Sequence, residues 1–149
     1  MKEFKQLGAY GIVIKDEKIL LIKKHGGPYD GKLDLPGGTI EFGERPEVAL
    51  KRELEEEVGI KVNDYSLFDA DSVNFEWLYE KENLLINVHH VGIFYKVLNY
   101  NGDIQQNVEI TEQNDDSEGA DFYNIKSLEK ENLSQIALLE LEKLGYIIK

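Results

Sequence analysis

The sequence contains no cysteine, only three prolines and no long hydrophobic run. Disulfide bonds, thiolate metal ligands and cysteine nucleophiles are therefore excluded, and the composition is typical of a reducing compartment. The longest purely aliphatic stretch is 19–22, whereas about 20 apolar residues are needed to cross a bilayer. The first six residues also lack the apolar segment of a secretory signal. We expect a cytoplasmic protein that has no membrane partner.

Basic residues are fewer than acidic ones: the chain has 17 Lys and Arg and 29 Asp and Glu, which gives a net charge of −12. This charge disfavours binding to a nucleic acid polymer, whose phosphates must be neutralised by Lys and Arg. The acidic residues concentrate in two segments, 38–60 and 103–121, and the second has no basic residue. A single acidic run is commonly a solvated surface. Two such runs shift the balance towards binding of a cation.

The 149 residues, 42% of them hydrophobic, suffice for one domain spanning 1–149. Residues 8–14 and 19–24 are β-branched and aliphatic runs joined by the polar segment 15–18, which predicts a hairpin. Further strands are predicted at 67–77, 84–98 and 120–125. The strand at 84–98 has apolar residues on both pleat faces, so we expect it to be central.

Two helices are predicted between these strands. Pro46 suits the first turn of a helix and Gly59 the position after its last turn, so the first helix is predicted at 46–58. In the second, Asn132 is followed three residues later by Gln135, which is typical of an N-terminal cap. This alternation predicts an α/β fold in which a mixed β-sheet carries helices on both faces. The alternative is an α+β sheet with both helices on one side.

Three carboxylates of the first helix share one face. Glu53, Glu56 and Glu57 are related by i,i+3 and i,i+4 spacing, which places them within about 100° around the helix axis. Like charges at this spacing destabilise a helix by a few tenths of a kcal/mol per pair. The face is either a solvated acidic surface or a site for a hard divalent cation, Mg²⁺ or Mn²⁺.

A wider pattern surrounds these glutamates. After Gly38 come five residues and Glu44, then seven residues and the run 52–60, Arg-Glu-Leu-Glu-Glu-Glu-Val-Gly-Ile. This spacing matches the Nudix box at every specified position, and the chain resembles the Nudix hydrolase family. The resemblance implies an α/β/α sandwich that hydrolyses, with Mg²⁺, a nucleoside diphosphate linked to a group X. Nucleoside triphosphates (oxidised ones included), ADP-ribose, nucleotide sugars and dinucleoside polyphosphates all fit this description.

The resemblance also implies roles for individual residues. Arg52 would hold the glutamates in register, and the general base would be Glu53 or the later Glu118. The implied metal ligands are Glu44, Glu53, Glu56, Glu57 and the backbone of Gly38. The backbone of Gly37 and Gly38 would approach the substrate closely, although a plain tight turn explains these glycines almost as well. Lys23 and Lys24 end a predicted strand near the glycine-rich loop, so either one of them reaches a phosphate of the substrate or the two form an ordinary exposed pair.

Other candidates and other functions remain open at this point. Four aromatic residues are candidates for stacking on a base, although such residues more often pack within sheets: Tyr29, Phe75, Trp77 and Tyr79. The three histidines His25, His89 and His90 are weaker candidates for contact with substrate. A nucleotide-sensing Nudix domain without catalysis and a simple cation-binding module are the alternative functions. The related isopentenyl diphosphate isomerases rely on a cysteine that this chain lacks. A homodimer is compatible with such a domain.

Overall fold

The computed structural model describes residues 1–104 and 117–149, and their strands form two four-stranded sheets. The first sheet has the order β5-β1-β7-β6. Its strands are β1 (Lys2–Ile12), β5 (Gly37–Thr39), β6 (Lys61–Tyr79) and β7 (Leu84–Asn101). Because β1 and β7 are parallel while the other neighbours are antiparallel, the sheet is mixed, as predicted. The expected central position of the strand beginning at residue 84 is confirmed.

The second sheet is smaller and is arranged around β3 (Lys18–Lys24). Its other strands are β2 (Ile14–Lys15), β4 (Leu33–Asp34) and β8 (Ser117–Asn124). The predicted hairpin therefore joins β2 to β3, and the chain passes from the first sheet to the second at Val13. Its turn residues Asp16 and Glu17 both have positive φ angles, 52° and 62°, which a two-residue hairpin turn requires.

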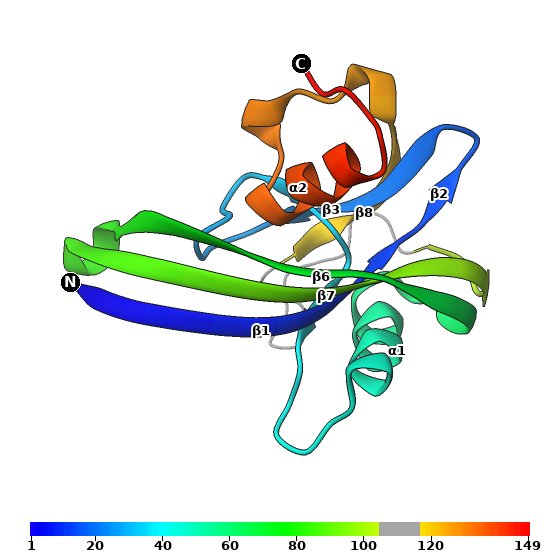
Figure 1. The fold of residues 1–149 in the computed structure, drawn as a ribbon, viewed down its shortest axis with the longest axis horizontal. Helices are drawn as coiled ribbons and strands as arrows, with labels where there is room; N and C mark the ends of the chain where they lie inside the picture. The colour runs from blue at the N-terminus through cyan, green and yellow to red at the C-terminus, as the bar shows by residue number, and fades with distance from the viewer. Residues whose placement is uncertain (105–116) are drawn as a thin grey trace.

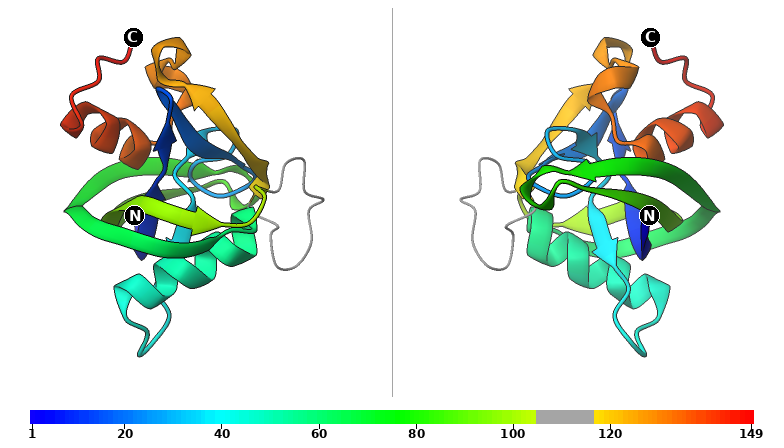
Figure 2. Two further views of the ribbon diagram at one scale, coloured as in Figure 1. Left: turned by 90° about the vertical axis from the view of Figure 1, so that its right-hand side faces the viewer. Right: turned by 90° about the vertical axis from the view of Figure 1, so that its left-hand side faces the viewer.

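Two helices lie on opposite sides of the strands, α1 (Pro46–Val58) below them and α2 (Gln135–Lys143) above them in Figure 1, and Figure 2 agrees. This arrangement is the expected α/β/α layering. Helix α1 has the predicted bounds, and Gly59 ends it in the left-handed conformation with φ 77°. Short 3₁₀ turns occupy Glu80–Glu82, Ile125–Ser127 and Lys130–Asn132.

The prediction that Asn132 caps the second helix was wrong. The N-cap of α2 is Ser134, whose hydroxyl accepts a hydrogen bond from the backbone N–H of Ala137 at 3.2 Å. The same hydroxyl donates to Asp34 on β4 at 2.6 Å, and the backbone N–H of Ser134 donates to the carbonyl of Leu33. These tertiary contacts with β4, which sequence spacing does not reveal, place the start of α2 at Gln135.

Each helix covers its own hydrophobic cluster. Leu50, Leu54 and Val58 of α1 pack on one side of the strands, and Ile136, Ala137 and Leu141 of α2 pack on the other. All six side chains are fully buried. The two clusters hold the helices against the sheets. No helix in the described residues is both long and apolar enough to cross a membrane.

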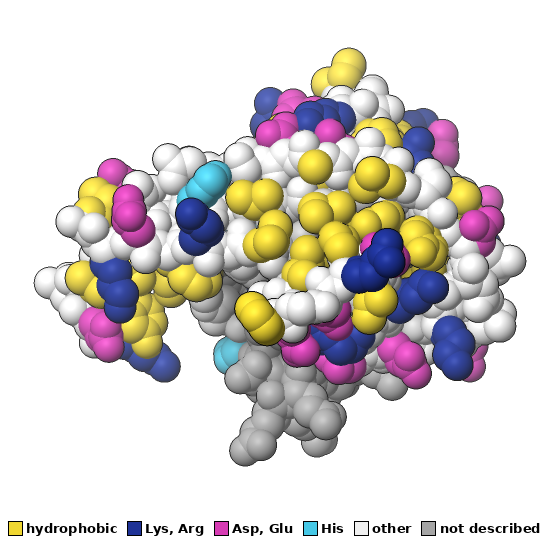
Figure 3. Space-filling view, turned by 60° about the horizontal axis from the view of Figure 1, so that its bottom comes forward, with side chains coloured by type: hydrophobic (Ala, Val, Ile, Leu, Met, Phe, Trp, Pro, Cys, Tyr) yellow, Lys and Arg dark blue, Asp and Glu magenta, His cyan; other side chains and the backbone are white. Residues whose placement is uncertain are grey.

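The first sheet continues beyond both helices as a long arm formed by β6, β7 and the first half of β1 (Figure 1). On the face that carries α1, the arm leaves Leu7, Leu78 and Leu85 between 40% and 49% exposed. Figure 3 shows hydrophobic side chains mixed with charged ones on this side of the molecule. The opposite face of the arm contributes to the cavity described below.

Helix α2 buries one carboxyl group, that of Glu140, which is 1% exposed. Its neighbour Lys143 instead forms salt bridges with Asp69 and Asp71 of β6, at 2.6 and 2.5 Å. Within the described part of the chain, no group donates a hydrogen bond to either side-chain oxygen of Glu140. Burial, together with the nearby carboxylate of Asp69, raises the pKa of Glu140 to about 8.

We expect Glu140→Gln to stabilise the protein at pH 8 and to have little effect at pH 5. The carboxyl ionises near pH 4.5 when unfolded but near 8 when folded, so its charge opposes folding increasingly as the pH rises between these values. The gain is at most about 1.4 kcal/mol per pH unit across this window. Urea unfolding from pH 5 to 9 measures it, with the exposed Glu142→Gln on the same helix as control. An equal effect of Glu140→Gln at pH 5 and pH 8 would contradict the raised pKa.

Candidate active site

The site begins where strand β5 passes close to β1 and α1, at Gly37 and Gly38. A Cβ atom at Gly37 would lie 2.2 Å from the carbonyl oxygen of Ala9, and one at Gly38 would lie 2.7 Å from the carboxyl of Glu53. Gly37 also has a φ angle of 141°, which favours glycine. Its backbone N–H donates to Oε1 of the buried Glu57 at 2.9 Å. The two glycines thus allow two box glutamates to reach the β5 backbone, which a plain turn does not require.

Arg52 is the centre of the charge network on α1. Its guanidinium donates to both oxygens of Glu44 at 2.8 and 2.9 Å, to Glu53 at 2.9 Å and to the carbonyl of Thr39 at 3.0 Å. A longer contact of 3.4 Å reaches Glu56. The forked geometry of arginine suits such bidentate carboxylate contacts. Arg52 thus contacts Glu44, Glu53 and Glu56, and its role in holding the glutamates in register stays a prediction.

Glu44 lies at the entrance to α1 and is fixed from two sides. Its carboxylate accepts from Arg52 and from the backbone N–H of Glu41 at 3.0 Å. These hydrogen bonds, that of Arg52 first, lower the pKa of Glu44 to about 2. In turn, the hydrogen bond to Glu44 raises the pKa of Arg52 above its usual value. Both groups are therefore charged across the physiological range.

The predicted metal ligands lie near one another but point to different partners. Glu44 and Glu53 contact Arg52, Glu57 contacts Gly37, and Glu56 is exposed. Among the described residues, no three Asp, Glu or His side chains are grouped closely enough to form a complete metal site. The oxygen donors nevertheless suit Mg²⁺ or Mn²⁺, because Mg²⁺ commonly takes one or two carboxylates and fills its other positions with water and substrate oxygens.

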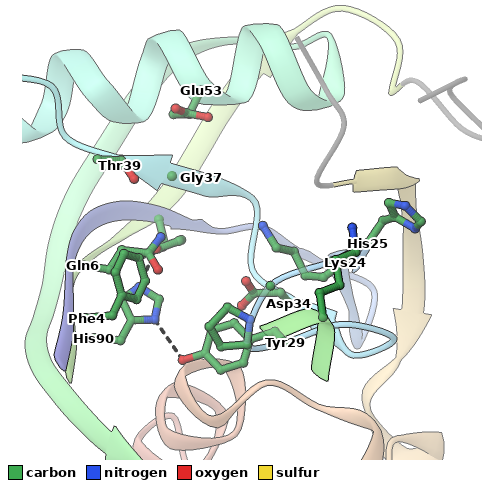
Figure 4. Close-up of a pocket in the computed structure, with 16 residues that line it drawn as sticks. Phe4, Gln6, Lys24, His25, Tyr29, Asp34, Gly37, Thr39, Glu53 and His90 are labelled. Atoms are coloured by element: carbon green, nitrogen blue, oxygen red, sulfur yellow. Dashed lines mark hydrogen bonds between the residues drawn. The ribbon is translucent and has the colours of Figure 1, made fainter. Parts of the chain in front are cut away.

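A cavity of about 570 Å³ extends from Glu53 across β5 to the face of the first sheet (Figure 4). Glu53, Gly37 and Gly38 lie at its α1 end. Basic and imidazole groups also line it, namely Lys24, His25 and Lys81. The remaining lining residues are Phe4, Gln6, Tyr10, Gly26, Gly27, Pro28, Tyr29, Asp34, Thr39 and His90. One cavity thus combines carboxylates with cations, as a phosphate-bearing ligand and its metal ion require.

The two lysines predicted to bind substrate have different positions. Lys24 lines the cavity, whereas Lys23 is exposed and is not among the described residues that line it. Successive residues of a strand point to opposite faces, so β3 can direct one of the pair to the cavity. The side chain of the candidate base Glu118 lies outside the described residues, as do Asp115 and Asp116.

Several cavity residues carried no specific signal in the sequence. Tyr10 and Asp34 read as ordinary strand residues, and Lys81 lies in the connection between β6 and β7. His90 was a weak candidate, yet it is 1% exposed and lines the cavity, while His89 is exposed. Only the pairing of β1 with β7, far apart in the chain, brings Tyr10 and His90 together.

The aromatic candidates for base stacking are divided between the cavity and the arm. The ring of Tyr29 lines the cavity and stacks on Phe75 with centroids 5.5 Å apart. Trp77 and Tyr79 pack against each other at 5.3 Å on the arm. Packing within the sheet, the commoner role of strand aromatics, therefore accounts for Phe75, Trp77 and Tyr79, while Tyr29 also faces the cavity.

Comparisons with known proteins agree with this geometry. The family model described as the NUDIX domain matches residues 5–141, so the chain belongs to the Nudix family. A MutT Nudix hydrolase from Burkholderia pseudomallei has a similar structure, with a TM-score of 0.74 at 27% identity over 95% of this chain and 99% of that one. The family and the fold expected from the sequence are confirmed.

Curated relatives match over shorter stretches. An ADP-ribose pyrophosphatase from Methanocaldococcus jannaschii is 52% identical over 50 residues, which are 34% of this chain and 30% of that protein. An 8-oxo-dGTP diphosphatase from Escherichia coli is 41% identical over 69 residues, 45% of this chain and 54% of that protein. An oxidized purine nucleoside triphosphate hydrolase from Danio rerio is 32% identical over 102 residues, 68% of this chain and 60% of that protein. The chain thus spans less than two thirds of the length of each of these relatives.

We expect Arg52→Met to return the pKa of Glu44 from about 2 towards the ordinary carboxyl value of 4.5, because its strongest hydrogen bonds are lost. In the wild type, the contribution of this carboxylate to stability is complete above pH 4.5 and disappears as the pH falls to about 2. An NMR titration of the Glu44 side-chain carboxyl carbon measures the change. Lys51→Met, which removes a neighbouring positive charge from α1, is the control. A Glu44 pKa that stays near 2 in Arg52→Met would show that Arg52 is not its main partner.

Proposed function

We propose that this protein is a pyrophosphohydrolase that cleaves a nucleoside diphosphate linked to a group X, with Mg²⁺ or Mn²⁺ as cofactor. Water attacks one phosphorus of the pyrophosphate, the bridging P–O bond breaks, and the products are the nucleoside monophosphate and phosphorylated X. The observation that carries the proposal is the cavity with Glu53 and the β5 glycines at one end and Lys24, His25 and Lys81 on its walls.

Glu53 and Glu57 are the residues best placed to hold the metal ion, with Glu56 and the Gly38 backbone as further ligands. Glu57 is fixed by the Gly37 N–H, and Glu53 by Arg52. The bound metal ion would neutralise charge on the phosphate oxygens and lower the pKa of a water molecule. Glu44 would act through Arg52, since it orients the guanidinium that contacts Glu53.

Cationic groups of the chain would bind the rest of the phosphate. Lys24 and Lys81 line the same cavity, so their positive charges oppose the negative net charge of the chain there. The proton released by the attacking water needs a base, and the candidates remain Glu53 and Glu118. The position of Glu53 in the cavity lining favours Glu53 as the base.

The names of the relatives support a small nucleotide as the substrate. Their names cover ADP-ribose and oxidised purine nucleoside triphosphates. Both are nucleoside diphosphates carrying a further group, which supports the general reaction and leaves X open between them. A sensing domain that binds nucleotides without hydrolysis is the competing function.

Glu57→Gln should lower the hydrolysis rate by at least about 100-fold, as expected for loss of a metal ligand. Its fold should persist, because the amide oxygen of glutamine can still accept the hydrogen bond from Gly37. Product analysis over nucleoside triphosphates, oxidised deoxynucleotides, ADP-ribose, nucleotide sugars and dinucleoside polyphosphates, with and without Mg²⁺ or Mn²⁺, measures the effect. Glu55→Gln is the matched control, since Glu55 is an exposed acid of the same helix that does not line the cavity.

One outcome would reject the metal-ligand role of Glu57, and another would reject the hydrolase itself. Equal loss in Glu55→Gln and Glu57→Gln would mean that general acidity, and not the Glu57 position, matters. Nucleotide binding without turnover of any substrate in the panel would establish the sensing function instead.

A further inference from the structure

Three buried side chains of the cavity form a hydrogen-bonded trio, and Figure 4 shows two of them, Tyr29 and His90, on the side away from Glu53. The hydroxyl of Tyr10, from β1, lies 2.5 Å from Nε2 of His90 on β7. The hydroxyl of Tyr29, from the loop between β3 and β4, lies 2.8 Å from Nδ1 of the same ring. Both nitrogens of His90 are therefore engaged, and both of their partners line the cavity.

All three members of the trio are neutral at physiological pH. Burial, and to a lesser extent the charge of Lys24, lowers the pKa of His90 to about 4. Burial, with a smaller contribution from Asp34, raises the pKa of both tyrosines above the usual value. The imidazole thus carries one N–H and one lone pair, and each tyrosine carries its hydroxyl hydrogen.

The trio has one hydrogen-bond donor more than its internal hydrogen bonds use. It has three polar hydrogens, one from each residue, and the two hydrogen bonds within it use two of them. Whichever ring nitrogen is protonated, one tyrosine donates to His90 and the other accepts from it. The accepting tyrosine keeps a hydroxyl hydrogen for a third group. Since buried donors are nearly always paired, this hydrogen needs an acceptor, which either the buried carboxylate of Asp34, lining the same cavity, or an atom of a bound ligand can supply.

The surroundings indicate a planar ligand at this place. Phe4 and Gln6 of β1 line the cavity beside the trio, so aromatic faces and an amide meet there. Aromatic side chains commonly stack on nucleobases. Gly8 preserves the position of Tyr10, because a Cβ atom there would lie 2.4 Å from the Tyr10 hydroxyl oxygen. In Figure 4, Gly37 and Thr39 lie between this part of the cavity and Glu53. The one cavity therefore reaches from the trio to the Glu53 end, so a base at the trio could carry phosphates towards the metal site.

We propose that the Tyr10–His90–Tyr29 trio binds the base of the nucleotide and donates one hydrogen bond to a ring carbonyl, so that it selects keto bases over their amino counterparts. This proposal rests on the function proposed above and specifies the substrate class of that site. Tyr10 and Tyr29 are the specificity-determining residues, and His90 is a positioning residue that acts through them.

The test compares substrates that differ at one ring position, ITP with ATP and UTP with CTP. Wild type should favour the keto member of each pair by about two- to tenfold in kcat/KM, mainly through KM, as expected for one hydrogen bond. Tyr10→Phe or Tyr29→Phe, whichever removes the outward donor, and His90→Leu should bring the ratio close to one. His90→Gln should retain it, because an amide also provides one donor and one acceptor. Tyr123→Phe on β8, outside the cavity lining, is the control.

Binding of the α,β-methylene analogues, whose bridge resists hydrolysis, separates this inference from the proposed function. A keto preference in binding without turnover of any nucleotide would support the trio and reject the hydrolase. Turnover with equal use of keto and amino bases would reject the trio. A keto preference that persists in both Tyr→Phe variants and in His90→Leu would also overturn the proposal. The selection would then come from groups other than the trio.

Discussion

The close approach of β5 to its two neighbours is the constraint on which the site depends. Without side chains at Gly37 and Gly38, the strand lies against the Ala9 carbonyl on one side and the Glu53 carboxyl on the other. This contact brings the acidic face of α1 to the edge of a sheet whose other residues form the cavity. Glu57 then reaches the Gly37 N–H, so helix and strand share a hydrogen bond at the place where the predicted metal ligands gather.

Charge balance explains how so acidic a chain forms such a site. Arg52 binds two of the predicted ligands, Glu44 and Glu53, with hydrogen bonds of 2.8 to 2.9 Å. It thereby limits the repulsion that three glutamates on one helical face would otherwise cause. Arg52 thus neutralises carboxylates of the protein itself. A metal ion and the cavity lysines would neutralise the phosphates of the substrate. These two systems of positive charge would make strong overall acidity compatible with the anionic substrate proposed above.

The sequence was most informative where local chemistry decides the structure. Pro46 and Gly59 define the ends of α1, and the spacing of Gly38, Glu44 and Arg52 identifies the family. It was least informative where distant contacts decide. The hydroxyl of Ser134, the N-cap of α2, donates a hydrogen bond to Asp34, which lies 100 positions away in the chain. Local spacing does not reveal this contact and wrongly favoured Asn132 as the cap. The sequence predicted a single sheet, whereas the structure has two. The chain leaves the first sheet at Val13, in the middle of an aliphatic run that predicted one uninterrupted strand.

The pairing of β1 with β7 has a consequence for how the protein folds. Hairpin β6–β7 joins strands that are adjacent in the chain, whereas β1 must find a parallel partner far along it, and Tyr10 and His90 are 80 residues apart. Closing such a loop costs chain entropy before the pairing stabilises it, and non-local topologies fold slowly. The β6–β7 hairpin can therefore form early, before β1 joins it. The cavity that would recognise the base comes into existence only when β1 has docked, late in folding.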